Sequence, residues 1–354
     1  MSPALNRYLR SVAYARNQLH RISGSSLGPH EFLHEVSRLI RTVVPHTAPA
    51  WTTIDPGSLL PTGALRSEKS PDLVRALWRN ELLDDDVNGI ADLLPLATPV
   101  AALSELHPAT LAESPRVQLI HRPAGIGDEL RVLLRADGIV WGKGALYRAA
   151  DERVFAVEER AFVGGIVPLI TAALRHRLAR RPPEGDGLLT PGVVIVDRAD
   201  RLTWTTLEGT RLMALIPGEP TTTLLAVAAQ ARVREQASAR VRLADGRWLL
   251  VQAASMHEAV GTSSQVAVTL MPAPRSTMLP IILALHALSP REREVAQLLQ
   301  LGLRTDEIAA HLHISPHTLR DHIKSVFHKL GVSHRAELMA LVAQYVTPDG
   351  RLRR

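Results

Sequence analysis

Hydrophobic positions in residues 1–180 recur with helical spacing near both ends and alternate with polar positions in between. Apolar residues three or four positions apart predict helices at residues 5–22, 31–44, 73–83 and 158–178. Alternating residues predict two strands at residues 129–135 and 139–147. Asp137-Gly138 lies between them and is a typical pair for a two-residue hairpin turn. We therefore expect this segment to be a mixed α+β domain.

Residues 188–272 contain more strand-like runs than the preceding segment. We predict strands at residues 192–197, 202–206, 240–243, 248–253 and 264–270, with a helix at 223–232. Asp245-Gly246 marks a second hairpin turn. Two hairpins and a last strand, with helices inserted, are typical of a small antiparallel α+β domain.

Two segments rich in proline separate these patterns. Residues 180–187 contain two prolines, two glycines and several charges, a composition that cannot continue the preceding helix. A second pair of prolines lies within residues 271–275, after the last strand-like run. The sequence shows no internal repeat. The predicted domains are residues 1–180, residues 188–272 and residues 283–346.

The last part of the chain carries start and stop signals for a series of short helices. Ser289 and Glu292 form a capping box, and Pro290 occupies the favoured first helical position. Gly302 stands where a glycine commonly ends a helix. Further helices are predicted to open at Thr305, to span residues 315–330 up to Gly331, and to span residues 333–345.

The helix predicted at residues 315–330 has two contrasting faces. Leu319, Ile323, Val326, Phe327 and Leu330 are spaced to pack on the two preceding helices. The other face carries a polar stripe, formed by His317, Arg320, Asp321, Lys324 and His328. Such a helix fits the major groove of B-DNA, where arginine and lysine reach guanine and aspartate accepts from cytosine. On charge pattern alone, a solvated helix face is the commoner explanation of the stripe.

The order of residues from Leu288 to Leu338 resembles the LuxR/NarL-type (GerE-type) DNA-binding domain. The matching segments are Leu288-Ser-Pro-Arg-Glu-Arg-Glu-Val, Glu307-Ile-Ala, Ile314-Ser-Pro-His-Thr-Leu, His322-Ile, Lys329-Leu-Gly-Val and Arg335-Ala-Glu-Leu. These segments occur in the order and at the spacing of the family pattern, so the match from Leu288 to Leu338 contains no gap. The resemblance implies an all-α four-helix domain with a helix-turn-helix, whose third helix enters the major groove.

The resemblance also assigns roles to individual residues. It implies that Arg320, Asp321 and Lys324 read bases, with His317 beside them on the same face. The implied phosphate contacts are Thr305, Ser315, Thr318, Lys329 and Arg335. The fourth helix resembles the family's dimerisation helix, with Leu338, Leu341 and Val342 as its apolar edge.

Asp321 departs from the uncharged residue often found at its position in the family. A carboxylate beside phosphates is unfavourable unless it is paired. We therefore expect Asp321 either to accept a hydrogen bond from cytosine or to form an ion pair with Arg320 or Lys324.

Charge and composition modify this picture in a few ways. The formal net charge of +6 is compatible with a polyanionic partner, but residues 283–354 contain ten Arg and Lys against seven Asp and Glu. Seven histidines lie in the same stretch, which predicts tighter DNA binding at mildly acid pH. The chain has no cysteine, so disulfides, thiolate zinc sites and cysteine redox sensing are excluded.

No apolar run is long enough to cross a membrane, and residues 1–10 lack the order of a secretion signal. A cytoplasmic protein is therefore expected. Asp84-Asp85-Asp86 follows a helix and not a first strand, which argues against a phosphoacceptor receiver domain.

Catalytic and metal-binding patterns are also missing from the sequence. We find no glycine-rich phosphate loop and no Gly-x-Ser-x-Gly elbow. The histidines at 311, 313, 317 and 322 fall on different helices and faces, so no metal site is expected. The sequence therefore predicts neither an enzyme nor a bound cofactor.

The two N-terminal domains have weaker resemblances. Residues 127–180 are similar to the end of a GAF domain, with Ile139-Val-Trp-Gly in the second strand of a hairpin before an acidic-start helix. Residues 188–272 resemble a PAS domain, with Asp245-Gly-Arg-Trp at a strand-turn-strand. Both folds commonly bind small molecules or serve as dimerisation scaffolds. Trp51, Trp78, Trp141 and Tyr147 are candidates for a pocket, although core packing is the commoner role of such residues.

Together these patterns predict a multidomain one-component transcriptional regulator. The expected partners are double-stranded DNA, a second copy of the chain, RNA polymerase and a small-molecule effector of unknown identity. Two other classes remain open. A signalling enzyme regulated by GAF and PAS modules would require a catalytic motif, and an interaction adaptor would leave Arg320 and Lys324 dispensable for DNA binding.

Overall fold

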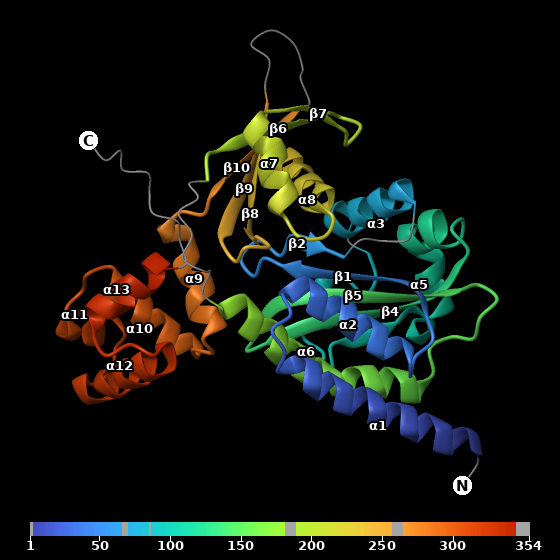
Figure 1. Cartoon of the computed structure of the whole chain (residues 1–354), viewed down its shortest axis with the longest axis horizontal. Coiled ribbons are helices and arrows are strands. Elements are labelled where there is room, and N and C mark those ends of the chain that lie inside the picture. Colours follow the sequence, from blue (N-terminus) through green and yellow to red (C-terminus); the bar gives the residue numbers. More distant parts are fainter. Residues whose placement is uncertain (1–2, 66–69, 85, 181–188, 257–264, 345–354) are drawn as a thin grey trace.

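The computed structural model describes residues 3–65, 70–84, 86–180, 189–256 and 265–344 (Figure 1). It contains two α+β units, residues 3–180 and residues 189–272, and a helical C-terminal module, residues 275–344. The expected fold class, α+β followed by all-α, is confirmed. Among these described ranges, no helix is both long and apolar enough to cross a lipid bilayer.

The first unit is a five-stranded antiparallel sheet with helices on both faces. Its helices are α1 (Pro3–Ser23), α2 (Pro29–Arg41), α3 (Pro71–Leu83), α4 (Ile90–Leu93), α5 (Pro108–Glu113) and α6 (Val157–Ala179), with a 3₁₀ turn η1 (Leu103–Glu105) and a π-helical turn η2 (Arg116–His121). Its strands are β1 (Thr47–Ile54), β2 (Pro61–Ala64), β3 (Val100–Ala102), β4 (Ile126–Ala136) and β5 (Ile139–Ala149).

The β4–β5 hairpin forms where the sequence predicts it. Asp137 and Gly138 both have positive φ, at 53° and 74°, which a two-residue turn of this hand requires. The helices predicted at residues 5–22, 31–44, 73–83 and 158–178 are confirmed as α1, α2, α3 and α6. Helices α1, α2 and α6 pack together, with α2 against β1 and α6 against β4. They cover one face of the sheet, while α3 lies on the other side (Figure 1).

The second unit is a smaller five-stranded antiparallel sheet with two helices. Its strands are β6 (Gly192–Val196), β7 (Leu202–Thr205), β8 (Gln236–Arg242), β9 (Trp248–Ser255) and β10 (Val266–Pro272), and its helices are α7 (Leu207–Leu215) and α8 (Pro220–Arg234). Strand order is β2-β1-β5-β4-β3 in the first sheet and β7-β6-β10-β9-β8 in the second. The two orders are identical when strands are counted within each unit. The chain thus repeats a topology without a detectable repeat in sequence.

Helix α8 lies between the two units. It packs against β8, β9 and β10 of its own sheet, and also against α3 and β2 of the first unit (Figure 1). An ion pair strengthens this junction: Arg240 Nη2 lies 2.7 Å from Asp55 Oδ1, and Asp55 is only 1% exposed. The same guanidinium donates to the carbonyl of Thr277 at 2.9 Å, which joins the junction to the C-terminal module.

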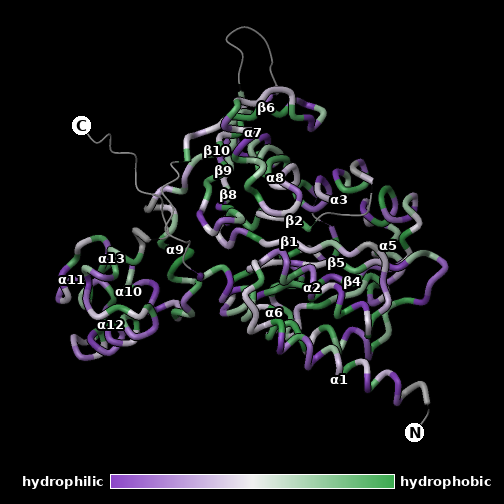
Figure 2. Tube along the Cα trace, in the orientation of Figure 1, coloured by the Kyte–Doolittle hydropathy of each residue, from purple (hydrophilic) through white to green (hydrophobic). Residues whose placement is uncertain are grey.

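The C-terminal module consists of α9 (Arg275–Leu285), α10 (Pro290–Gln300), α11 (Thr305–His311), α12 (Pro316–Leu330) and α13 (Arg335–Gln344). The sequence analysis did not predict α9, and the boundary expected at residue 283 lies inside it. Figure 2 shows α9 as mainly hydrophobic and α12 as mainly hydrophilic. Helix α9 packs against α6, α10 and α13, so one continuous apolar cluster extends from the first unit into the module.

Aromatic side chains serve the core of the first unit. Trp51, Trp141 and Tyr147 are buried in it. Trp51 and Trp141 belong to the same apolar cluster as α2 and α6. The expected core role is therefore confirmed for Trp51 and Trp141, while Trp51, Trp78 and Tyr147 also line a cavity, the alternative role considered for them.

Candidate nucleic-acid interface

Helix α10 begins with the capping box that its sequence predicts. Ser289 Oγ accepts from the backbone N–H of Glu292 at 3.3 Å, and the Glu292 carboxylate accepts from the backbone N–H of Ser289 at 2.6 Å. Glu292 also reaches α12: Ser325 Oγ donates to Oε1 at 2.5 Å and Lys329 Nζ lies 2.7 Å from Oε2. One buried carboxylate therefore caps the first helix of the motif and binds the third.

The surroundings of Glu292 favour its ionised form. Burial by itself would raise the pKa of this carboxyl group. The hydrogen bonds from Lys329, Ser325 and Ser289 outweigh burial and lower the pKa to about 2. Glu292 is thus a carboxylate throughout the physiological range.

Replacing Glu292 with glutamine is expected to destabilise the chain by about 1–3 kcal/mol at neutral pH, because charge-assisted hydrogen bonds are lost. The folded state lowers the pKa, so the carboxylate stabilises the fold above the ordinary value of 4.5 and that contribution disappears as the pH falls towards 2. The difference between wild type and E292Q should shrink over the same range. Urea unfolding at a series of pH values measures it.

The matched control for this experiment is Glu294→Gln on the same helix. Glu294 is more exposed and pairs only with Arg291 on its own helix among the described residues. Its loss should change the unfolding free energy little. A pH-independent difference between wild type and E292Q would contradict the role given to the Glu292 charge.

Helices α11 and α12 form the helix-turn-helix that the sequence predicts. Helix α11 begins at Thr305, and α12 is capped by Ser315, whose Oγ accepts from the backbone N–H of Thr318 at 3.1 Å. Gly331 ends α12 with φ 65° and ψ 37°, a left-handed conformation that glycine adopts without strain. Ile314 packs on the core between the two helices.

The polar stripe of α12 lies on the surface of the whole chain. His317, Arg320, Asp321, Lys324 and His328 are all exposed. Leu319, Val326 and Leu330 on the opposite side are buried, and α12 packs against α10 and α11 through that side. The structure thus brings the predicted base-reading residues together on one accessible face.

Asp321 has a different partner from the one expected. Its Oδ2 lies 3.2 Å from Nδ1 of His317, one helical turn earlier. The spacing of four residues places both side chains on the same helix face. The described residues show no ion pair of Asp321 with Arg320 or Lys324, and the hydrogen bond from cytosine stays a prediction.

The predicted phosphate contacts divide into two groups. Thr305, Ser315 and Thr318 are exposed near the N-termini of α11 and α12. Lys329 is held by Glu292, as described above. Arg335 donates from Nη1 to the carbonyl of Leu303 at 2.9 Å and from Nη2 to the carbonyl of Leu299. Lys329 and Arg335 therefore connect the helices of the module, and their contacts with phosphate stay a prediction.

The predicted dimerisation edge is occupied within the single chain. Leu338 and Leu341 are 0% and 2% exposed and belong to the cluster that α9 shares with α13. The side chain of Val342 lies outside the described residues. Helix α13 packs against α9 and α10, so a dimer contact through Leu338 and Leu341 would require this packing to open. The side of α13 that remains exposed carries Ala336, Met339 and Ala340.

Sequence reasoning missed two features of this interface. It identified Glu292 as a capping residue and Lys329 as a phosphate contact, but it did not predict that the two form an ion pair. It also missed α9, although the apolar run in residues 279–288 is a signal for a buried helix.

Residues 286–342 match the family model described as bacterial regulatory proteins, luxR family. The chain is 43% identical over 53 residues to the probable transcriptional regulatory protein NarL of Mycobacterium tuberculosis, which is 15% of this chain and 24% of that protein. It is 47% identical over 51 residues to the transcriptional regulatory protein UhpA of Escherichia coli, which is 14% of this chain and 26% of that protein.

The chain covers about a quarter of the length of these two proteins. Solved structures are similar over longer stretches at low identity. Escherichia coli SdiA matches with a TM-score of 0.35 and 11% identity, over 94% of this chain and 97% of that one. A GAF domain/HD domain protein from Geobacter sulfurreducens matches with a TM-score of 0.32 and 19% identity, over 43% and 96%.

Proposed function

Starting from a helix-turn-helix domain of the luxR family at residues 286–342, we propose that the whole chain is a one-component transcriptional regulator. In this proposal α12 reads the major groove, and the two α+β units sense a signal that controls binding. The observation that carries it is the exposed stripe of α12. Arg320 and Lys324 lie on the face of α12 that is turned away from α10 and α11 and is exposed.

The chemistry of the stripe suits sequence reading and not only charge attraction. Arginine and lysine donate to guanine O6 and N7, and a carboxylate accepts from cytosine N4. The exposed hydroxyls of Ser315 and Thr318 lie at the N-terminus of α12, where the helix dipole favours a phosphate. This arrangement supports a helix that enters the groove with its N-terminal half.

A second copy of the chain belongs to the proposal. Two copies would place two recognition helices about one DNA turn apart, roughly 34–36 Å, on a repeated half-site. The exposed side of α13, with Ala336, Met339 and Ala340, is available for the contact without disturbing α9. RNA polymerase is the protein partner that a regulator bound at a promoter would meet.

The relatives of the module are named as transcriptional regulators and not as enzymes. The remaining alternative is an adaptor whose helix-turn-helix contacts only proteins. Binding to DNA separates these two functions directly, because an adaptor has no phosphate contacts and no dependence on counterion release.

The test is binding of the full-length protein to the duplex upstream of its own coding sequence, across a salt series. A protein that contacts about six to ten phosphates loses roughly 10³–10⁵-fold in affinity between about 50 and 200 mM salt. We expect a steep loss of this kind and a preference over a random duplex of equal length. Equal, weak binding to both duplexes, or affinity unaffected by salt, would reject sequence-specific DNA binding in favour of the adaptor.

A further inference from the structure

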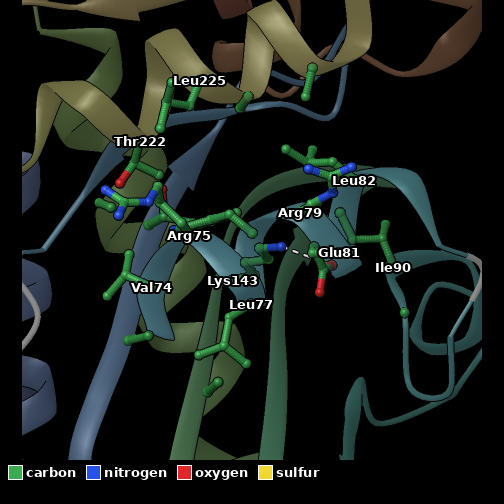
Figure 3. A pocket seen from close by; sticks show the side chains of 18 of the residues that line it. Val74, Arg75, Leu77, Arg79, Glu81, Leu82, Ile90, Lys143, Thr222 and Leu225 are labelled. Carbon is green, nitrogen blue, oxygen red and sulfur yellow. Dashed lines mark ion pairs between the residues drawn. The ribbon is translucent and has the colours of Figure 1, made fainter. Parts of the chain in front are cut away.

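A cavity of about 810 Å³ lies where the first and second units meet. Its floor is formed by β1, β4 and β5 of the first sheet, and α3 and α8 contribute its walls (Figure 3). Sites for small molecules in proteins typically enclose about 300–1,000 Å³ and commonly lie between domains. The size and place of this cavity therefore suit a small organic ligand.

The walls offer apolar surface from both units. Val74, Leu77 and Trp78 of α3 and Leu225 of α8 line the cavity and are only half-buried. Figure 3 shows side chains of α3 and α8 around the same space. Apolar side chains left partly uncovered inside a cavity gain stability when an apolar ligand covers them.

The floor adds a charged group to this apolar space. Glu81 of α3 pairs with Lys143 of β5 at 2.8 Å (Figure 3). It also pairs with Arg131 of β4 at 2.5 Å. The ammonium group of Lys143 also lies 4.6 Å from the ring centroid of Trp78. An ammonium group has three donor hydrogens, and Glu81 accepts one of them.

A second layer of buried charge lies behind the floor. Glu129 is completely buried, with Arg131 Nε at 3.1 Å and Arg116 Nε at 3.4 Å. Burial alone would raise the pKa of Glu81, but Arg131 and Lys143 outweigh it and lower the pKa to about 2. Burial would also raise the pKa of Glu129, but Arg131 and Arg116 outweigh it and lower that pKa, so both glutamates are ionised. Burial lowers the pKa of Lys143, and its pair with Glu81 opposes that shift. With Lys143 protonated, the cations Arg116, Arg131 and Lys143 exceed the two glutamates by one positive charge.

So many buried charges contribute little to stability, since desolvation offsets most of the attraction between them. Such networks beside a cavity are typical of functional sites.

The charged residues that line the cavity are mostly cationic. The cationic lining residues are Arg75, Arg79, Arg131, Lys143, Arg198 and Arg232, and the acidic ones are Glu81, Asp200 and Glu219. The described lining thus favours an anion.

We propose that this cavity binds a small amphipathic organic anion, with its anionic group at Arg131 and Lys143 and its apolar body between α3 and α8. The molecule would touch both units at once, because the floor and α3 belong to the first and α8 to the second. The inference rests on the proposed function only in identifying the bound anion as the sensed signal.

The test uses the full-length protein and two fluorescent probes of similar shape, anilinonaphthalene sulfonate as the anion and phenylnaphthylamine as its neutral counterpart. We expect saturable binding of the anionic probe with one site per chain, and weaker binding of the neutral one. Lys143→Met removes the charge and keeps the apolar stem. It should lower the affinity for the anionic probe by about tenfold or more and leave the affinity for the neutral probe nearly unchanged.

Two further variants make the location testable. Leu225→Trp fills the α8 side of the cavity and should exclude both probes. Arg211→Met removes an exposed charge on α7, outside the cavity lining, and should change neither. Equal affinity of the wild type for the two probes would overturn the proposal without any variant. Unchanged binding of the anionic probe to both K143M and L225W would also overturn it.

No step of this experiment involves DNA. If the cavity proposal were rejected, the expected result of the salt series with the upstream duplex would not change. If DNA binding failed, the expected probe binding would not change. The two proposals can therefore fail separately.

Discussion

Full-length protein with both Arg320→Ala and Lys324→Ala should lose its preference for its own upstream duplex over a random one. Each good base contact in the major groove is worth about 1–3 kcal/mol of discrimination, so loss of both should lower specific affinity by roughly 100-fold or more. The two side chains are exposed on α12 and carry no core packing, so the fold should survive. Competition binding at one fixed salt concentration measures the ratio.

The matched control is Arg211→Ala, which removes an exposed arginine of α7 on the second unit. It should leave the preference unchanged. A double variant that discriminates between the duplexes as the wild type does would remove α12 from the recognition role, even if binding itself stayed dependent on salt.

The second large effect is expected on stability. Arg240→Ala should lower the free energy of unfolding by about 3–5 kcal/mol, the usual result of removing one partner from a buried ion pair. Asp55 is 1% exposed and accepts from the guanidinium at 2.7 Å and 3.2 Å. Arg240 also donates to Thr277 at the start of α9. Its loss should therefore loosen the second unit from both the first unit and the module.

A double-mutant cycle isolates the pair. The double variant Asp55→Ala, Arg240→Ala should be less destabilised than the sum of the two single variants, because neither charge is left alone. Chemical denaturation of all four proteins gives the coupling. Additive effects would show that Asp55 and Arg240 have no coupling free energy. A decrease in the free energy of unfolding below about 1 kcal/mol for Arg240→Ala would be the value of an ordinary surface ion pair.

Elements that depend on neighbours in the sequence were predicted well. The capping box of Ser289 and Glu292, the helix from Ser315 to Gly331 and the turn at Asp137-Gly138 all form as expected. Each rests on contacts within a few residues, where backbone preference and hydrogen-bonding capacity decide the outcome. The exposed face of α12 was predicted for the same reason, since helical spacing alone places its polar stripe opposite its buried side.

Strands β1 and β2 of the first sheet were not predicted. Thr47–Ile54 contains Pro49 and lacks regular alternation, and Pro61–Ala64 is only four residues long. They pair with each other, and β1 also pairs with β5, far along the chain. Such pairing is a tertiary interaction that local preference does not encode.

The partners of the site residues were also decided by the tertiary structure. Residues that pair across 37 positions, as Glu292 and Lys329 do, meet only when α10 packs on α12. Leu338 and Leu341 form an apolar edge in the sequence, and that edge is buried because α13 packs against α9 and α10.

The difference is clearest at the cavity. Glu81, Arg131 and Lys143 come from three separate elements, and α8 of the other unit closes the space above them. Their charges are ordinary in the sequence and become a site only when burial and mutual distance are set by the fold. The spacing of residues thus accounts for a DNA-reading helix, because a helix is local. A ligand cavity requires contacts between distant segments, and only the folded chain provides them.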